Sequence, residues 1–254
     1  MQRKREKSRD GLSSAQVQKT IGDNLSFAAA EAYKLLRTNL EFSLPNESGC
    51  KVIGITSSLR GEGKSTTSIN IAYTVAQTGK KVLLMECDLR LPALAKRLRI
   101  NARPGISNLL AGQCSGNKIL QNSGLQPNLW VAAAGDIPPN PAELLGSEQM
   151  AITMKALSEL FDVIIVDLPP VTVVSDAAVV SKLVSGMVVV VRQDYCDRDS
   201  LDELIRQLRF AGCKILGFVM TDSDIQKKGY KRYGTSYGDY KKHPSEGAGK
   251  RGGA

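Results

Sequence analysis

Short apolar runs alternate along the chain with stretches in which apolar residues recur at helical spacing. The continuous runs predict five strands buried on both faces: 51–57, 80–88, 162–170, 186–193 and 214–222. The spaced stretches predict three helices: 26–44, with Ser26 as its N-cap, 64–79 and 199–212. Such strands alternating with amphipathic helices indicate an α/β fold, a mainly parallel sheet with helices on both faces.

The same pattern divides the chain into three parts. A basic flexible segment is expected over residues 1–25, a folded domain over 26–222 and, where the hydrophobic pattern stops, a disordered C-terminal tail over 223–254. A chain of 254 residues with 42% hydrophobic content is long enough for one α/β domain with a well-buried core.

The net charge of +9 lies mostly at the two ends. Residues 1–10 hold five Lys and Arg against two acids, and residues 223–254 hold eight against three, which leaves the rest nearly neutral. A nucleic-acid-binding domain is expected to place its basic residues on the folded surface, so no nucleic acid partner is predicted. The basic ends either solubilise the chain or are attracted to an anionic membrane surface, at about 1 kcal/mol per basic residue near it.

Cysteine and histidine usage excludes some classes of site. The five cysteines are scattered and never spaced as Cys-x-x-Cys, which is typical of free thiols in a reducing compartment. The single histidine, His243, lies in the predicted tail, so neither a zinc cluster nor a histidine-based nucleophile relay is expected. No apolar run approaches the roughly 18 residues of a transmembrane helix, and residues 1–10 lack the apolar stretch of a signal peptide. We therefore expect a cytosolic protein.

The segment SSLRGEGKST (57–66) follows the first predicted strand and opens a helix. It matches the phosphate-binding pattern G-x-x-x-x-G-K-[ST], except that Ser58 replaces the first glycine. Gly61 and Gly63 allow successive backbone N–H groups to face phosphates at the positive end of the helix. Lys64 would reach the β- and γ-phosphates and the Ser65 hydroxyl would ligate Mg²⁺; the alternative is a glycine-rich turn with no ligand. The predicted ATP contacts are Ser58, Gly61, Glu62, Gly63, Lys64, Ser65 and Thr66.

Three carboxylates follow other predicted strands. Asp167 ends an apolar run, where it can hold Mg²⁺ beside Ser65, although a carboxylate there is also common as a helix cap. Glu86 and Asp88 lie two apart at the end of the second predicted strand, so both are expected to face the γ-phosphate. One would help to position the metal and the other would accept the proton of an incoming hydroxyl. The alternative is a structural loop in which Arg90 pairs with Asp88.

Four of the seven tyrosines lie in YKRYGTSYGDYKK (230–242), a segment with no aliphatic residues from which to build a core. These are Tyr230, Tyr233, Tyr237 and Tyr240. One alternative is an aromatic, basic tail that binds RNA or membrane by stacking and charge.

Together these motifs resemble the bacterial tyrosine kinases, P-loop kinases that govern capsule and exopolysaccharide export. The resemblance covers roughly Phe27 to Tyr240. It rests on the loop at 57–66, the acidic motif at 83–90, the strand at 163–170, the terminal tyrosines and the segment GDIPPNPAELLGS (135–147). The Pro-Pro-Asn-Pro of that segment is expected to end a strand and start a short helix.

The resemblance implies ATP and Mg²⁺ as cofactors, with Lys64 and Ser65 binding ATP·Mg and with Asp167 and Asp88 organising the metal. Glu86 stands where the family has a catalytic-base aspartate, and its side chain is one methylene longer. The four tyrosines would accept phosphate in trans from a neighbouring subunit, which would add a charge of roughly −6 to −8 to the tail.

Two further positions depart from the family pattern. Glu31, Lys34 and Arg37 stand where the family shows a Glu-x-x-Arg-x-x-Arg oligomerisation motif, and Lys34 loses the bidentate fork of arginine. The alternative is an ordinary charged helix face. Thr221 and Asp222 stand where many relatives have an adenine-contacting asparagine.

The resemblance also implies partners: a transmembrane activator whose cytosolic tail completes the nucleotide site, a homo-oligomeric ring, a tyrosine phosphatase and protein substrates. The kinase would lie at the inner face of the membrane through its activator. The alternative function is a partition or cell-division-positioning ATPase acting as a nucleotide-dependent dimer. Its signature lysine would fall at Leu59, and the last residues, 247–254, lack the spacing of an amphipathic membrane helix. A third reading, a basic RNA-binding module, conflicts with the nearly neutral core.

Overall fold

The computed structural model describes residues 20–44 and 49–223. The chain divides into two units, Met1–Thr221 and Asp222–Ala254, and the fold described here is that of the first. The tyrosine cluster and most of the predicted tail lie outside the described residues, as does most of the predicted N-terminal segment. The strands are β1 (Lys51–Ser57), β2 (Val82–Glu86), β3 (Leu120–Asn122), β4 (Leu129–Ala132), β5 (Val163–Asp167), β6 (Gly186–Arg192) and β7 (Ile215–Thr221).

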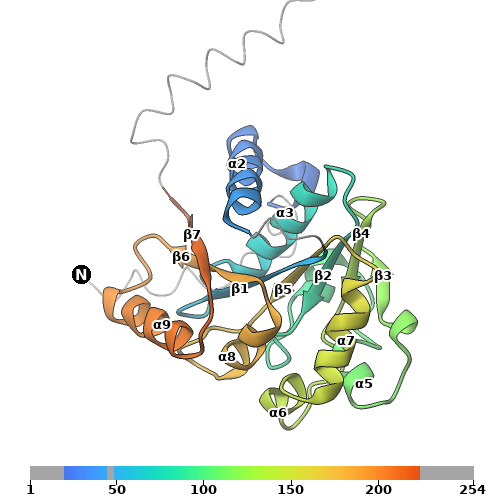
Figure 1. The fold of residues 1–254 in the computed structure, drawn as a ribbon. Coiled ribbons are helices and arrows are strands. Elements are labelled where there is room, and N and C mark those ends of the chain that lie inside the picture. Colours follow the sequence, from blue (N-terminus) through green and yellow to red (C-terminus); the bar gives the residue numbers. More distant parts are fainter. Residues whose placement is uncertain (1–19, 45–48, 224–254) are drawn as a thin grey trace, which may run out of the picture. The chain divides into compact units, whose positions relative to one another are not determined.

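The helices lie between these strands and before β1 (Figure 1). They are α2 (Phe27–Ser43), α3 (Lys64–Ala76), α4 (Leu94–Leu98), α5 (Ile106–Leu110), α6 (Pro141–Leu145), α7 (Glu148–Ser158), α8 (Asp176–Val180) and α9 (Arg198–Phe210). Short 3₁₀ turns occupy Gly22–Asn24, Gly116–Lys118 and Ser181–Leu183. The helix that was predicted to begin at Ser26 is confirmed, because the Ser26 side chain accepts a hydrogen bond from the backbone N–H of Ala29.

The strands form one seven-stranded sheet in the order β3-β4-β2-β5-β1-β6-β7. Within this described sheet the pairs are parallel, except that β3 runs antiparallel to β4. The five predicted strands and the mainly parallel sheet are confirmed, whereas β3 and β4 were not predicted. Because β1 and β2 are both parallel neighbours of β5, the carboxyl ends of the three strands meet at one edge, and Glu86 and Ile55 both align with Asp167.

Two apolar layers cover the sheet, one on each face (Figure 1). The first layer joins residues of α2, α3 and α4 to the sheet, and the second joins residues of α5 to α9 to the opposite face. Side chains of β1 alternate between them, since Val52 packs in the second layer while Ile53 and Ile55 pack in the first. Full burial of each such side chain contributes about 1.5–3 kcal/mol to stability. Because each layer includes helical residues, the predicted helices on both faces of the sheet are confirmed.

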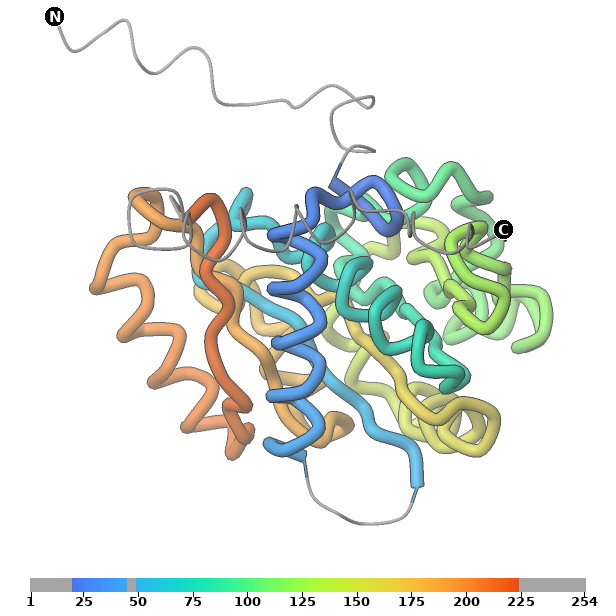
Figure 2. The backbone as a smooth tube through the Cα atoms, turned by 90° about the horizontal axis from the view of Figure 1, so that it is seen from above, coloured from blue at the N-terminus to red at the C-terminus, as the bar shows by residue number. Residues whose placement is uncertain are grey.

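Helix α2 lies beside β7 on one side of the sheet, as Figure 2 shows. Arg37 donates a 2.9 Å hydrogen bond to the carbonyl of Thr74 near the end of α3. Lys214, next to β7, donates to the carbonyl of Ser43 at the end of α2. These contacts fix α2 against the sheet through both of its neighbours.

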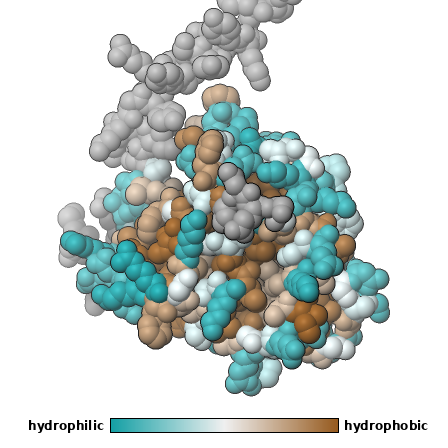
Figure 3. All heavy atoms as spheres, in the orientation of Figure 1, coloured by the Kyte–Doolittle hydropathy of each residue, from teal (hydrophilic) through white to brown (hydrophobic). Residues whose placement is uncertain are grey.

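The surface of the described residues includes large apolar side chains. Phe42 on α2 is 86% exposed and Phe210 on α9 is 97% exposed. On the face seen in Figure 1, apolar surface lies among the hydrophilic side chains (Figure 3). In the part of the chain that the structure describes, no helix is both long enough and apolar enough to span a membrane.

Candidate functional site: a phosphate-binding loop and its acidic neighbours

The loop between β1 and α3 has a backbone that two glycines make possible. Gly61 and Gly63 have φ angles of +86° and +95°, a left-handed region that residues with a Cβ rarely adopt. Gly63 is the N-cap of α3, and its carbonyl accepts the first helical hydrogen bond from Thr67. The free N–H groups of the first turn therefore point out of the helix end, where they favour an anion.

Lys64 is a nearly buried cation at this helix end. It is the first residue of α3 and is 8% exposed. Within residues 20–44 and 49–223, its ammonium group has neither an ion pair nor a hydrogen bond. An unpaired ammonium group beside the free N–H groups of a helix N-terminus is suited to an anionic ligand.

Asp167, at the end of β5, presents an unpaired carboxylate oxygen beside the same helix. Its Oδ1 accepts a 2.9 Å hydrogen bond from Ser68, whereas its Oδ2 is buried with no hydrogen-bond partner among the described residues. Burial raises the pKa of Asp167, and the nearby Lys64 opposes that rise. Mg²⁺ is usually held by one or two carboxylates together with substrate phosphates and water. The free oxygen of Asp167 and the Ser65 hydroxyl fit that ion.

Glu86 is held by three backbone N–H groups. Its Oε1 accepts from Leu94 at 2.7 Å and from Ala93, and its Oε2 accepts from Ala134 at 3.2 Å. The side chain is fully buried, and this burial raises the pKa of Glu86 to about 7. Its carboxylate therefore links the start of α4 to the segment that follows β4.

Asp88 differs from Glu86 in position and exposure. Strand β2 ends at Glu86, so the alternation of side chains along a strand does not extend to Asp88. The argument that Glu86 and Asp88 face the same way because they lie two apart on a strand therefore does not apply. Asp88 is only partly buried, and its Oδ1 accepts a hydrogen bond from the N–H of Leu91. Burial raises the pKa of Asp88 and the Lys64 ammonium lowers it, which indicates that the two charges are close.

The alternative in which Arg90 pairs with Asp88 is wrong. Arg90 instead forms a bidentate ion pair with Asp176 at the start of α8, with Nε–Oδ2 and Nη2–Oδ1 distances of 2.9 and 3.0 Å. Asp176 is fully buried. This pair ties the acidic motif to the segment that follows β5.

Arg97 is a cation of the site that the sequence analysis missed. From α4, its Nη1 donates a 3.1 Å hydrogen bond to the hydroxyl of Thr66 in the first turn of α3. Burial lowers the pKa of Arg97, while the carboxylates of Asp167 and Glu86 partly offset this. No carboxylate among the described residues lies within ion-pair distance of Arg97. Its only sequence signal is its place in the basic stretch KRLR that follows the acidic motif.

Glu62 organises the loop from inside. Its fully buried carboxylate accepts hydrogen bonds from the N–H of Leu59 at 2.7 Å and from the hydroxyl of Ser58 at 3.0 Å. Its carbonyl accepts a 2.7 Å hydrogen bond from the hydroxyl of Thr221, the last residue of β7. Its Oε1 also accepts a 3.3 Å hydrogen bond from the N–H of Arg192 at the end of β6. The contacts of Glu62 are thus with the loop, β6 and β7, and its predicted contact with ATP stays a prediction.

The three residues at the predicted oligomerisation motif do not act alike. Glu31 and Lys34 form an exposed ion pair of 2.7 Å within α2. Arg37 is directed to α3 within the same chain, as described above. The four predicted phosphate-accepting tyrosines lie outside the described residues.

Comparisons with known proteins agree with this geometry. A family model described as an AAA domain matches residues 50–214. The chain is 35% identical over 207 residues to tyrosine-protein kinase YwqD of Bacillus subtilis, covering 81% of this chain and 86% of that protein. The kinase domain of the Escherichia coli tyrosine kinase ETK superposes with a TM-score of 0.75 at 31% identity, covering 82% of each chain.

Two further solved structures help to place the fold. The chimerical protein CapA2B2 has a TM-score of 0.74 at 30% identity, covering 80% of this chain and 88% of that chain. The septum site-determining protein MinD of Pyrococcus horikoshii, complexed with Mg-ADP, has a TM-score of 0.59 at 21% identity, covering 69% of this chain and 72% of that chain. The likeness to MinD shows a shared fold alone.

Proposed function

Because the chain belongs to the bacterial tyrosine-protein kinases, we propose that it transfers the γ-phosphate of ATP to tyrosine hydroxyls, including those of its own residues 230–240. The observation that supports this most directly is that two charged groups of the site, one of each sign, each have an atom without a partner in the described part of the chain. The Lys64 ammonium forms no ion pair or hydrogen bond with the described residues, and the buried Oδ2 of Asp167 has no hydrogen-bond donor there. Mg-ATP supplies an anion to the first and a cation to the second.

In this proposal the residues of the chain bind and position the reactants. Lys64 and the N–H groups of the first turn of α3 hold the phosphates, and Arg97 adds a second cation beside Thr66. Asp167 and Ser65 would hold Mg²⁺, and Asp88 is a second carboxylate close to Lys64. The ion, when bound, neutralises charge on the β- and γ-phosphates.

The acidic motif is proposed to accept the phenol proton. The family resemblance assigns this role to Glu86, but both of its oxygens accept backbone hydrogen bonds and its side chain is fully buried. Asp88 is partly exposed, and its Oδ1 accepts from the N–H of Leu91. The geometry therefore favours Asp88 as the proton acceptor and Glu86 as the residue that positions α4.

The test is the intact mass of the full chain, with peptide mapping, after incubation with Mg-ATP and with the cytosolic tail of a candidate membrane activator. Phosphates on residues 230–240 that are absent in Lys64→Met establish the proposed transfer. ATP turnover with no added mass instead favours the positioning-ATPase alternative. Comparison of Asp88→Asn with Glu86→Gln separates the two carboxylates. Substitution of the proton acceptor is expected to lower kcat and to leave the stability against unfolding unchanged.

We also propose self-association through α2. Phe27, Glu31 and Leu35 recur every four residues and so share a face of this helix. Both apolar members are more than half exposed, as is Phe42 further along the helix. Exposed apolar surface of this kind often marks an interface. Because Arg37 is engaged with α3, the apolar residues and the Glu31–Lys34 pair are the groups that α2 offers to a second copy.

The remaining parts of the proposal rest on the family. They are a membrane-protein activator that brings the kinase to the inner face of the membrane, protein substrates, an opposing tyrosine phosphatase and a role in capsule or exopolysaccharide synthesis and export. Equal activity with and without the activator tail would contradict the first of these.

A further inference from the structure

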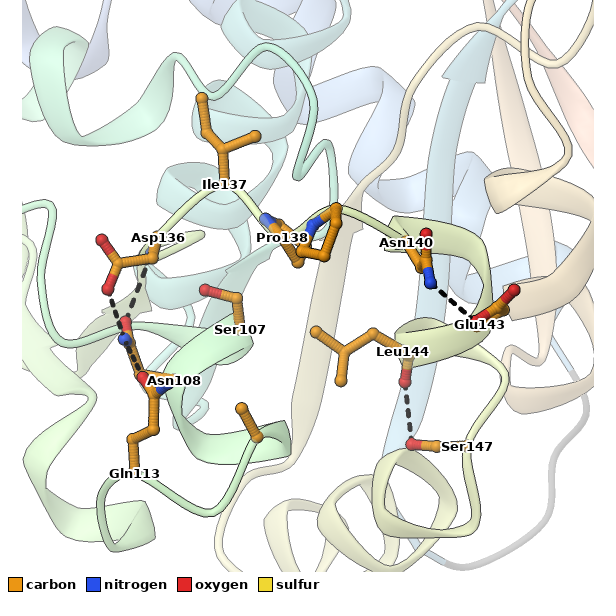
Figure 4. Close-up of a pocket in the computed structure, with 12 residues that line it drawn as sticks. Ser107, Asn108, Gln113, Asp136, Ile137, Pro138, Asn140, Glu143, Leu144 and Ser147 are labelled. Atoms are coloured by element: carbon orange, nitrogen blue, oxygen red, sulfur yellow. Dashed lines mark hydrogen bonds between the residues drawn. The ribbon is translucent and has the colours of Figure 1, made fainter.

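A pocket of about 490 Å³ lies beside the acidic motif and has no part in the function described so far (Figure 4). It is formed by α5, the segment that follows β4, and α6. Its volume falls in the range of small-ligand and side-chain pockets. It is lined by Ser107, Asn108, Ala111, Gln113, Asp136, Ile137, Pro138, Pro139, Asn140, Glu143, Leu144 and Ser147.

The wall of this pocket is rigid because two glycines allow close backbone contact. A Cβ on Gly105 would stand 2.3 Å from the carbonyl oxygen of Ala133, and one on Gly135 would stand 2.4 Å from Oδ1 of Asn108. The nearly buried Asn108 accepts from the N–H of Gly105 and donates to the side chains of Gln113 and Asp136. The pocket is thus formed before any ligand enters.

One polar group inside the pocket wall is unsatisfied. Ser107 is nearly buried, and its hydroxyl oxygen has no hydrogen-bond partner among the described residues. Figure 4 shows Ser107 between the Asp136 and Leu144 sides of the pocket. Unsatisfied buried polar groups are uncommon, and this one is consistent with a site that receives a polar ligand.

The pocket adjoins the catalytic edge of the sheet. Ala134, whose N–H binds Glu86, lies two residues before Asp136. Strand β4, which ends just before this segment, pairs directly with β2. A ligand in the pocket is therefore held next to the end of β2, from which the acidic motif begins.

The lining is acidic and partly apolar. It contains two carboxylates, Asp136 and Glu143, and no lysine or arginine. Arg103, outside the lining, pairs with Oδ1 of Asp136 at 2.7 Å, and Asn140 donates to Glu143. Ile137, 64% exposed, and Leu144 add aliphatic surface. Such a site fits a basic side chain whose aliphatic stem packs on the apolar wall.

We propose that this pocket binds the tyrosine segment of a second copy of the chain, by taking a basic side chain that flanks an acceptor tyrosine. The inference rests on the proposed kinase function. Residues 223–254 hold eight Lys and Arg against three acids, so their charge complements the pocket. Tyr230 is followed by Lys231 and Arg232, and Tyr240 by Lys241 and Lys242. Consecutive Cα atoms are only about 3.8 Å apart, so a basic residue in the pocket keeps its tyrosine at the catalytic edge.

The test uses two full-length forms of the chain. The enzyme form has phenylalanine at all four tail tyrosines, and the acceptor form is the Lys64→Met variant with its tyrosines intact. Glu143→Arg in the enzyme form is expected to raise the KM for the acceptor about threefold to tenfold, with ATP hydrolysis in the absence of acceptor unchanged. The same substitution in the acceptor form is expected to have no effect. Glu159→Arg, at an exposed site at the end of α7, is the matched control.

A charge exchange provides the stronger arm. The double substitution Lys231→Glu and Lys241→Glu in the acceptor form is expected to restore much of the transfer rate that Glu143→Arg in the enzyme form removes.

Normal transfer by the Glu143→Arg enzyme overturns the pocket proposal and leaves the kinase function standing. Loss of basal ATP hydrolysis, or an equal effect from either form, also overturns it, because the residue would then be structural. Loss of stimulation by an activator tail with an unchanged acceptor KM would assign the pocket to that other partner. Absence of transfer from the unsubstituted enzyme form in the presence of the activator tail, despite nucleotide binding, refutes the kinase function itself.

Discussion

Replacement of Asp167 by asparagine is expected to stabilise the protein in the absence of nucleotide. The wild-type carboxylate is 1% exposed, and one of its oxygens is buried without a donor. Its pKa is raised by burial even though Lys64 is nearby, which means that the folded state disfavours the charged form. Asparagine removes that charge and keeps an oxygen to accept from Ser68.

The amide NH2 of asparagine would take the place of the unpaired oxygen, so the gain comes from removing the buried charge; we take it to be of the order of the penalty for an unsatisfied buried group, about 1–3 kcal/mol. In a domain of this length, 1 kcal/mol shifts the unfolding midpoint by about 2–4 °C, so we expect Asp167→Asn to raise Tm by about 2–12 °C. With Mg-ATP at about a thousand times its Kd the order should reverse. This concentration stabilises the wild type by about 4.1 kcal/mol, and the variant, which lacks the metal-binding charge, should gain much less.

The assay is thermal unfolding followed by circular dichroism, with and without Mg-ATP. Ser68→Ala is the matched control, because it removes the Ser68 hydrogen bond to Asp167 and leaves the charge in place, so it should lower Tm. If Asp167→Asn melts below the wild type without nucleotide, the carboxylate is stabilising, and the inference that its free oxygen awaits a cation fails.

Three further substitutions test other parts of the site. Arg97→Ala should weaken nucleotide binding by about tenfold to a hundredfold, since a charge-assisted hydrogen bond is worth about 1.5–3 kcal/mol. Fluorescent-nucleotide titration measures this, and Lys96→Ala on the exposed side of the same helix should leave affinity unchanged. Gly105→Ala should destabilise by about 3 kcal/mol or more, because its Cβ would stand 2.3 Å from the Ala133 carbonyl oxygen; urea unfolding tests it, and an unchanged midpoint would show that the backbone can shift. Glu62→Ala should cost about 1–3 kcal/mol and also weaken nucleotide binding, because it leaves a loop N–H unpaired; a change in stability alone would limit its role to the fold.

Much of the fold could be predicted from the sequence because its main strands are continuous apolar runs. Strands β3 and β4 gave no such signal. They are three and four residues long, and the Gln121 and Asn122 side chains of β3 are polar and lie at the sheet edge. The short helix α6 was expected from its prolines, and Pro141 does begin it.

The candidate site could be predicted only where its residues are neighbours in sequence. The loop at 58–66 and Asp167 follow strands directly, so strand ends locate them. The position of Arg97 against Thr66 depends on how Glu86 turns the chain into α4, a contact between backbone and side chain that no spacing rule describes. For the same reason the different surroundings of Glu86 and Asp88 were hidden, because the period of two holds only while the strand lasts.

The central place of β1 in the sheet has a consequence for the nascent chain. Its two neighbours, β5 and β6, begin at Val163 and Gly186, so at translation rates of 5–20 residues per second β1 waits roughly 5–30 s for them. During that time a segment that ends up almost wholly buried has open edges on both sides and depends on shielding by the ribosome or by chaperones. The phosphate-binding loop, which begins where β1 ends, cannot close earlier. Affinity for nucleotide should therefore appear late in synthesis, as a sign that the whole sheet has assembled.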